Sequence, residues 1–116
     1  MERLEDIAES DELYRRLAPE HINRDGTVNS AAFKARGKPD PSFSVDLARL
    51  TTAEEALSRA PHEGFRLGAL PARVPLSLGL TVRHNPVEGN LAHCVIEGEN
   101  DKVKCRILAR NTRIIK

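Results

Sequence analysis

A short helix signal between two segments of alternating polarity restricts the fold more than any other feature. Thr51 and Thr52 are each followed, three residues later, by a glutamate. In such a capping box the threonine hydroxyl accepts a backbone N–H of the first turn, and the glutamate bonds back to the cap. We therefore predict a helix over about 52–60, which Pro61 ends because proline cannot continue a helix.

Alternating polarity predicts strands on both sides of this helix. In FSVDLARL, Phe43, Val45 and Leu47 alternate with smaller or polar residues, which is the period of a half-buried strand. GFRLGALP and LTVRH are also predicted strands, and LAHCVIEG is apolar enough to be central in a sheet. Between them, VPLSLG predicts one helical turn that ends at Gly79.

The two ends of the chain and the segment 28–34 are harder to assign. Apolar residues recur at helical spacing near the N-terminus, which predicts a helical segment over 1–18 with a break at Ser10–Asp11. VNSAAFK is ambiguous and is taken as a strand, and ARGKPDPS is a loop. A helix from about 102 to 112, capped by Asn100 or Asp101, competes with a strand over VKCRIL; we favour the helix. Its apolar face would hold Val103, Ile107 and Ile114.

The whole pattern predicts one α+β domain over residues 1–116, with four or five short, mostly antiparallel strands and two or three helices. A chain of 116 residues buries roughly two-thirds of its unfolded surface, enough for one core. Only 3% of the residues are aromatic, so we expect that core to be aliphatic.

Cysteine use and the N-terminal sequence both indicate the compartment. Two cysteines cannot form a disulfide framework, so Cys94 and Cys105 are expected to be reduced and partly buried thiols. MERLEDIAESDEL lacks the apolar core of a secretory signal, and no run approaches the ~18 apolar residues of a membrane span. We expect a cytoplasmic protein with no membrane association.

Charge is unevenly distributed although the net charge is only +1. Six acids and one base lie in residues 1–12, whereas residues 102–116 carry six bases and no acid. Such runs are usually solvated faces, which here would face each other across the fold. The alternative is a basic C-terminal segment that binds nucleic acid or an acidic partner, through Lys102, Lys104, Arg106, Arg110 and Arg113.

A cluster of reactive side chains suggests two kinds of chemistry. His84, His93, Cys94 and Cys105 fall within about two dozen residues. His93 and Cys94 are adjacent, so on a strand they point to opposite faces, and we predict no metal site and no cofactor. Alternatively, adjacent antiparallel strands would bring His84 and His93 together for general acid–base catalysis on RNA, with Arg83 or Arg106 on the phosphate.

Two resemblances extend these predictions. LYRRL, then SAAF, then a strand and an A-E-E-A-L helix resemble the opening of small ADP-ribosyltransferase-like toxins. That resemblance implies that Arg15 or Arg16, Ser30, and Glu97 or Glu99 handle NAD. More of the chain, about residues 11–98, is similar to a group of small bacterial proteins without an assigned activity, with DELYRRLAPE, FSVDLARLTTAEE and LGLTVRHNP among its matching segments. This likeness implies a bacterial source and a domain that stands alone.

The predicted function follows from an incomplete catalytic set and from segregated charge. We expect an accessory, protein-interaction domain that accompanies a toxin, nuclease or defence enzyme, rather than an enzyme. The first alternative is a small enzyme that uses His84, His93 and neighbouring arginines on RNA or NAD. The second alternative is nucleic-acid binding through the basic C-terminal segment.

Overall fold

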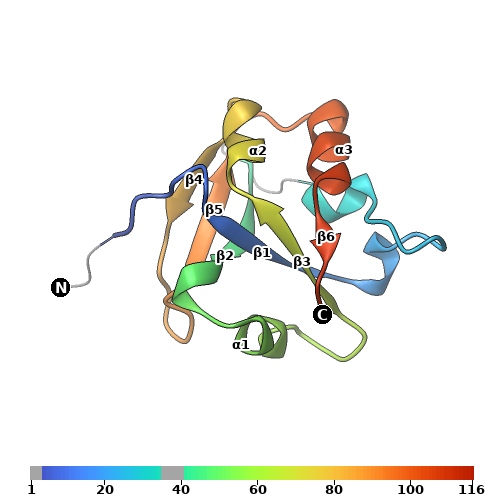
Figure 1. The fold of residues 1–116 in the computed structure, drawn as a ribbon, viewed down its shortest axis with the longest axis horizontal. Coiled ribbons are helices and arrows are strands. Elements are labelled where there is room, and N and C mark those ends of the chain that lie inside the picture. Colours follow the sequence, from blue (N-terminus) through green and yellow to red (C-terminus); the bar gives the residue numbers. More distant parts are fainter. Residues whose placement is uncertain (1–3, 35–40) are drawn as a thin grey trace.

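The structure, a computed structural model, describes residues 4–34 and 41–116. Its six strands form one antiparallel sheet in the order β4-β5-β2-β1-β3-β6, which confirms a small α+β domain (Figure 1). The strands are β1 (Glu12–Leu17), β2 (Ser42–Leu47), β3 (Arg66–Pro71), β4 (Thr81–His84), β5 (His93–Glu97) and β6 (Arg113–Ile114). The helices are α1 (Ala53–Ser58), α2 (Arg73–Ser77) and α3 (Lys102–Arg110), with 3₁₀ turns η1 (Pro19–His21), η2 (Ser30–Phe33) and η3 (Ala48–Leu50).

Most elements with a strong local signal form where the sequence predicts them. Thr52 caps α1, and its hydroxyl accepts the Glu55 N–H at 3.1 Å. Asp101 caps α3 by accepting the Lys104 N–H at 2.9 Å, which settles the helix-or-strand alternative for this segment. Gly79 ends the α2 turn at φ +80°, a left-handed conformation that glycine adopts without strain.

The predicted N-terminal helix is wrong, because residues 12–17 form β1, a strand between β2 and β3. Leu13 and Leu17 are buried on one face, and Arg15 lies between them on that same face. The Arg15 guanidinium donates to the Ala32 and Ser44 carbonyls, at 3.0 and 2.7 Å, and stacks over the Phe43 ring. Because Arg15 is a cation at an inward-facing position, it interrupts the alternation of apolar and polar residues that would have indicated a strand.

Three smaller expectations also change. VNSAAFK contains η2 in place of a strand, since the Asn29 side chain caps it by accepting the Ala31 N–H. The buried face of α3 is Cys105, Leu108 and Ala109, whereas Val103 is 60% exposed. The loop predicted over 35–42 lies almost wholly outside the described residues.

The sheet has two differently covered faces. On the first face, α2, α3 and η2 lie over the sheet (Figure 1). The main hydrophobic core is aliphatic apart from Phe33, Phe43, Cys94 and Cys105. On the second face, α1 packs against β1 and β3. The pairing of Tyr14 with Asp46, and of Asp46 with His93, assigns these three residues to the second face.

Candidate functional site

The two histidines predicted as a catalytic pair lie on opposite faces of the sheet. The β4–β5 register pairs His84 with Cys94, so these two side chains share the first face. His93, next along β5, therefore points to the second face, as expected for neighbours on a strand. The structure does not bring the two imidazoles together, and the predicted cross-strand arrangement is wrong by one residue of register.

Both imidazoles are also fully engaged in hydrogen bonds within the fold. Nδ1 of His84 accepts the Glu5 N–H at 2.9 Å, and its Nε2 lies 2.8 Å from the Leu91 carbonyl. His93 bridges the Asn85 carbonyl, at 2.8 Å, and the Ser44 hydroxyl, at 3.1 Å. Arg83, the third member of the predicted set, pairs with Glu97 at 3.0 Å. These contacts give the histidines positioning roles at the 85–92 loop.

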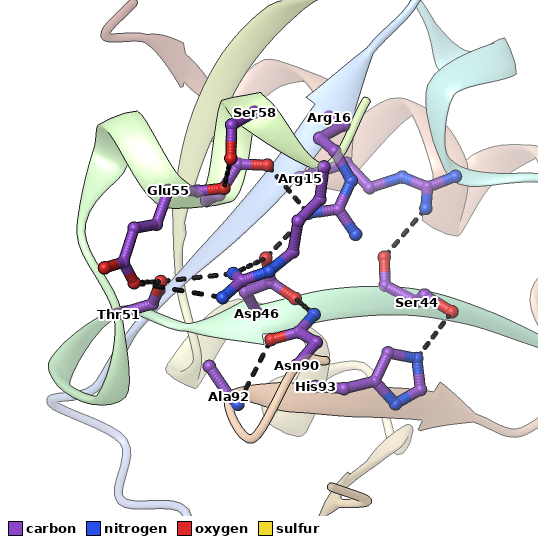
Figure 2. Close-up of polar contacts among 12 residues, drawn as sticks. Arg15, Arg16, Ser44, Asp46, Thr51, Glu55, Ser58, Asn90, Ala92 and His93 are labelled. Atoms are coloured by element: carbon purple, nitrogen blue, oxygen red, sulfur yellow. Dashed lines mark hydrogen bonds and ion pairs between the residues drawn. The ribbon is translucent and has the colours of Figure 1, made fainter. Parts of the chain in front are cut away.

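A buried carboxylate that the sequence did not single out organises the second face. Asp46 is 0% exposed, and its carboxylate accepts from Arg16 at 2.6 Å and from the Asn90 amide at 2.8 Å (Figure 2). The Arg59 guanidinium lies 3.6 Å away. Asn90 in turn accepts the Ala92 N–H, so the network ties β1, β2, α1 and the 85–92 loop together. All of these groups satisfy one another within the fold, which makes the network structural.

The residues implied by the toxin resemblance are dispersed. Arg15 and Arg16 do lie on an early strand, but they point to opposite faces of the sheet. Ser30 begins η2 near the first face, whereas Glu97 pairs with Ser42 on the second face and bonds Arg83. Glu99 is exposed in the β5–α3 connection. The structure therefore does not bring Arg15, Ser30 and Glu97 to one site.

Both cysteines are free and buried, as predicted. Burial, with a smaller contribution from the Asp46 charge, raises the pKa of the Cys94 thiol to about 11. Burial also raises the pKa of the Cys105 thiol, and the nearby Asp101 charge adds to the shift. Neither side chain has the lowered pKa of a nucleophilic thiolate.

The raised Cys94 pKa predicts a loss of stability at alkaline pH. In the unfolded chain this thiol ionises near its ordinary pKa of 9.0, below the folded value of about 11. The unfolded state therefore loses its proton first, and stability falls as pH rises from about 9 through 11, by roughly 1–3 kcal/mol. Urea unfolding across this range should show a shallower decline for Cys94→Ala than for wild type, even though the variant is less stable at pH 8. Parallel curves would contradict this assignment.

A cleft of about 510 Å³ opens between the 26–30 loop and the C-terminal half of α3. Hydrogen bonds hold the loop in place: Asn23 donates to the Thr27 carbonyl, and the Asn29 amide donates to the Glu20 carbonyl, both at 2.8 Å. Arg106 and Arg110 are one helical turn apart, so both project from the same side of α3. We call this the arginine cleft, and it is lined by Gly26, Thr27, Val28, Asn29, Ser30, Arg106, Ala109, Arg110, Thr112, Arg113 and Ile114.

The arginine cleft is strongly cationic. Arg106 and Arg110 are exposed and form no ion pair with another residue of the described chain. Arg113 pairs with Glu12, joining the basic and acidic segments at one point, but both side chains of this pair are solvent-exposed. Such a pair contributes about 0–1 kcal/mol, so an incoming anion can compete for Arg113. No carboxylate is among the described residues that line the cleft.

A second cleft, of about 390 Å³, adjoins the first along α3. We call it the lysine cleft because Lys34 and Lys102 lie at its rim, with Ser30, Ala31, Asn100 and Cys105 completing the lining. Ser30 lines both clefts, and its hydroxyl makes no hydrogen bond within residues 4–34 and 41–116. The two neighbouring clefts thus have Ser30 in common, and both are lined by positively charged side chains.

The predicted basic segment is therefore only partly assembled into one surface. Lys102, Arg106, Arg110 and Arg113 line the two clefts, whereas the Lys104 ammonium donates to the Glu99 carbonyl at 2.8 Å. Sequence reasoning missed Ser30, Lys34 and Asn100 as members of this surface. Their signal is tertiary, because η2 and α3 are far apart in the sequence and meet only in the folded domain. Comparisons with protein-family models, with curated proteins and with solved structures gave no match to this chain, so no family is assigned to it.

Proposed function

We propose that this domain is an accessory domain that binds nucleic acid through the arginine cleft. The observation that supports this function is that Arg106, Arg110 and Arg113 line one cleft, whose described lining residues include no carboxylate. Guanidinium groups match phosphate oxygens in charge and in bidentate geometry. Carboxylates also accept a guanidinium in bidentate fashion, so an acidic protein segment is the competing ligand for the same charges.

The setting of the proposed function is cytoplasmic, where nucleic acid is accessible. No helix within the described part of the chain is both long enough and apolar enough to cross a membrane.

The low net charge of +1 does not oppose the proposal, because the arginines act locally. Two acids of the N-terminal segment, Glu5 and Asp11, are paired to Arg49 away from the cleft, whereas Glu12 pairs with Arg113.

The test is the salt dependence of binding to a fluorescent oligouridylate of about 12 nucleotides. Three phosphate contacts on a single strand predict a slope near −2 in a log–log plot of affinity against salt. Affinity should then fall about 16-fold between about 50 and 200 mM salt. The double variant Arg106→Gln/Arg110→Gln should bind at least about tenfold more weakly at low salt and show a slope near −0.7.

A charge-matched control separates the cleft from general electrostatics. Arg73→Gln/Arg83→Gln removes two exposed arginines that line neither cleft, and it should leave both affinity and slope nearly unchanged. Equal weakening by the two double variants, or no binding at low salt, would overturn the proposal. Tighter binding of a glutamate-rich peptide of equal charge would replace nucleic acid with an acidic protein partner.

A further inference from the structure

Asn100, which lines the lysine cleft, carries a buried hydrogen-bond acceptor that lacks a donor among the described residues. The Asn100 amide nitrogen donates to the Phe33 carbonyl at 2.7 Å, which fixes the orientation of the amide. Its Oδ1 is buried, and no donor reaches it from the described residues. Leaving a buried acceptor unpaired is unfavourable, so such groups in native proteins often mark a bound partner.

The chemistry around Asn100 restricts what could supply the missing donor. Lys34 and Lys102 provide positive charge at the rim, and Ser30 provides a hydroxyl that makes no hydrogen bond within the described part of the chain. The described lining includes no aromatic ring on which a base could stack. The cleft therefore suits a sugar–phosphate unit, in which charged oxygens lie close to a hydroxyl donor, better than it suits a base.

The two clefts also lie next to each other along α3. Lys102, Arg106 and Arg110 recur every four residues, so they lie on one side of α3 and are about 6 Å apart along the helix axis at each step. Ser30 lies at the junction, since it lines both clefts. A single strand held by Arg106 and Arg110 would reach Lys102 and Asn100 without leaving this side of the helix.

We infer that the lysine cleft binds ribose, with Asn100 Oδ1 accepting a 2′-hydroxyl, so that the ligand of this domain is single-stranded RNA. This inference rests on the proposed function, and it adds a specificity that the arginines cannot supply. Guanidinium groups contact the phosphates that RNA and DNA share, whereas the 2′-hydroxyl is the donor that distinguishes them.

Ligand variants test the inference without altering the protein. Oligouridylate should bind wild type about tenfold more tightly than oligodeoxyuridylate of equal length, as expected for one buried hydrogen bond. The 2′-O-methyl oligomer keeps the oxygen but lacks the donor, so it should bind like the DNA. Equal affinity for RNA and DNA, or RNA-like binding of the 2′-O-methyl oligomer, would overturn the inference.

A protein variant then locates the preference. Asn100→Ala should lower RNA affinity to the DNA level while leaving DNA affinity and the salt slope unchanged, and Asn111→Ala, in the exposed C-cap of α3, should retain the preference. A preference that persists in Asn100→Ala would place the ribose contact elsewhere and refute the inference. Failure here is distinct from failure of the proposed function: binding of both nucleic acids that depends on Arg106 and Arg110 would preserve the latter, whereas no binding would remove both.

Discussion

Replacing Asp46 by alanine should destabilise the domain by about 3–5 kcal/mol, more than any surface substitution. The carboxylate is 0% exposed and is the common partner of Arg16, Arg59 and the Asn90 amide. Its loss leaves the partly buried Arg16 guanidinium without its counter-charge, and it frees the Asn90 amide that anchors the 85–92 loop. Urea unfolding followed by circular dichroism measures the effect, because the chain has no tryptophan.

The matched control for Asp46→Ala is Glu97→Ala. Glu97 also forms an ion pair, with Arg83 at 3.0 Å, but both side chains are substantially exposed. Exposed pairs contribute little because water and salt screen them, so Glu97→Ala should cost less than about 1 kcal/mol. Similar losses for the two variants would show that burial gives the Asp46 network no special role.

A double variant separates the cost of an orphaned charge from the intrinsic contribution of the pair. Arg16→Met/Asp46→Leu removes both charges and fills similar volume with apolar atoms. Replacing a buried ion pair by apolar residues of similar volume often costs a protein little stability. We therefore expect the double variant to be more stable than Asp46→Ala. A loss as large as that of Asp46→Ala, or larger, would instead mean that the ion pair itself contributes most of the stability, together with its bonds to Asn90 and the Ala56 carbonyl.

Local signals predicted much of this fold because their physical causes are local. A cap needs only its own first turn, so Thr52 and Asp101 locate α1 and α3 correctly. The prediction for the β1 segment failed because Arg15 occupies a core-facing position. The groups that contact its guanidinium there belong to Phe43, Ser44 and Ala32, in other segments of the chain. No window of sequence around Arg15 contains those partners.

The candidate site shows the same contrast between features with local causes and features that depend on distant segments. Clustered bases in the sequence predicted a basic segment, and the structure places four of them along two adjoining clefts. Asp46 reads in the sequence as an outward polar residue of an alternating strand, and only the cover of α1 and the 85–92 loop makes it a buried carboxylate. His84 and His93 were expected to lie across from each other on adjacent strands. The register instead pairs His84 with Cys94, one residue further along, so the two imidazoles lie on opposite faces; the sequence does not fix this register.

Phe33→Ala is expected to cost about 3–5 kcal/mol, because truncating a fully buried ring removes its packing and leaves a cavity. The ring packs edge-on against Phe43, with centroids 5.6 Å apart, and Phe33 belongs to η2, which packs against α3. For a domain of this size the thermal midpoint should fall by roughly 12 °C or more. Phe65→Ala removes the same atoms from a half-buried site and should cost clearly less.

The Phe33 variant also connects stability to binding. The Phe33 carbonyl accepts from both the Asn100 amide and the Cys105 thiol, so this one residue positions one wall of the lysine cleft against α3. At a temperature where Phe33→Ala is still folded, loosening of η2 should reduce the RNA preference, which depends on Asn100, more than the arginine contacts. An unchanged preference in a clearly destabilised variant would show that Asn100 is held by α3 alone.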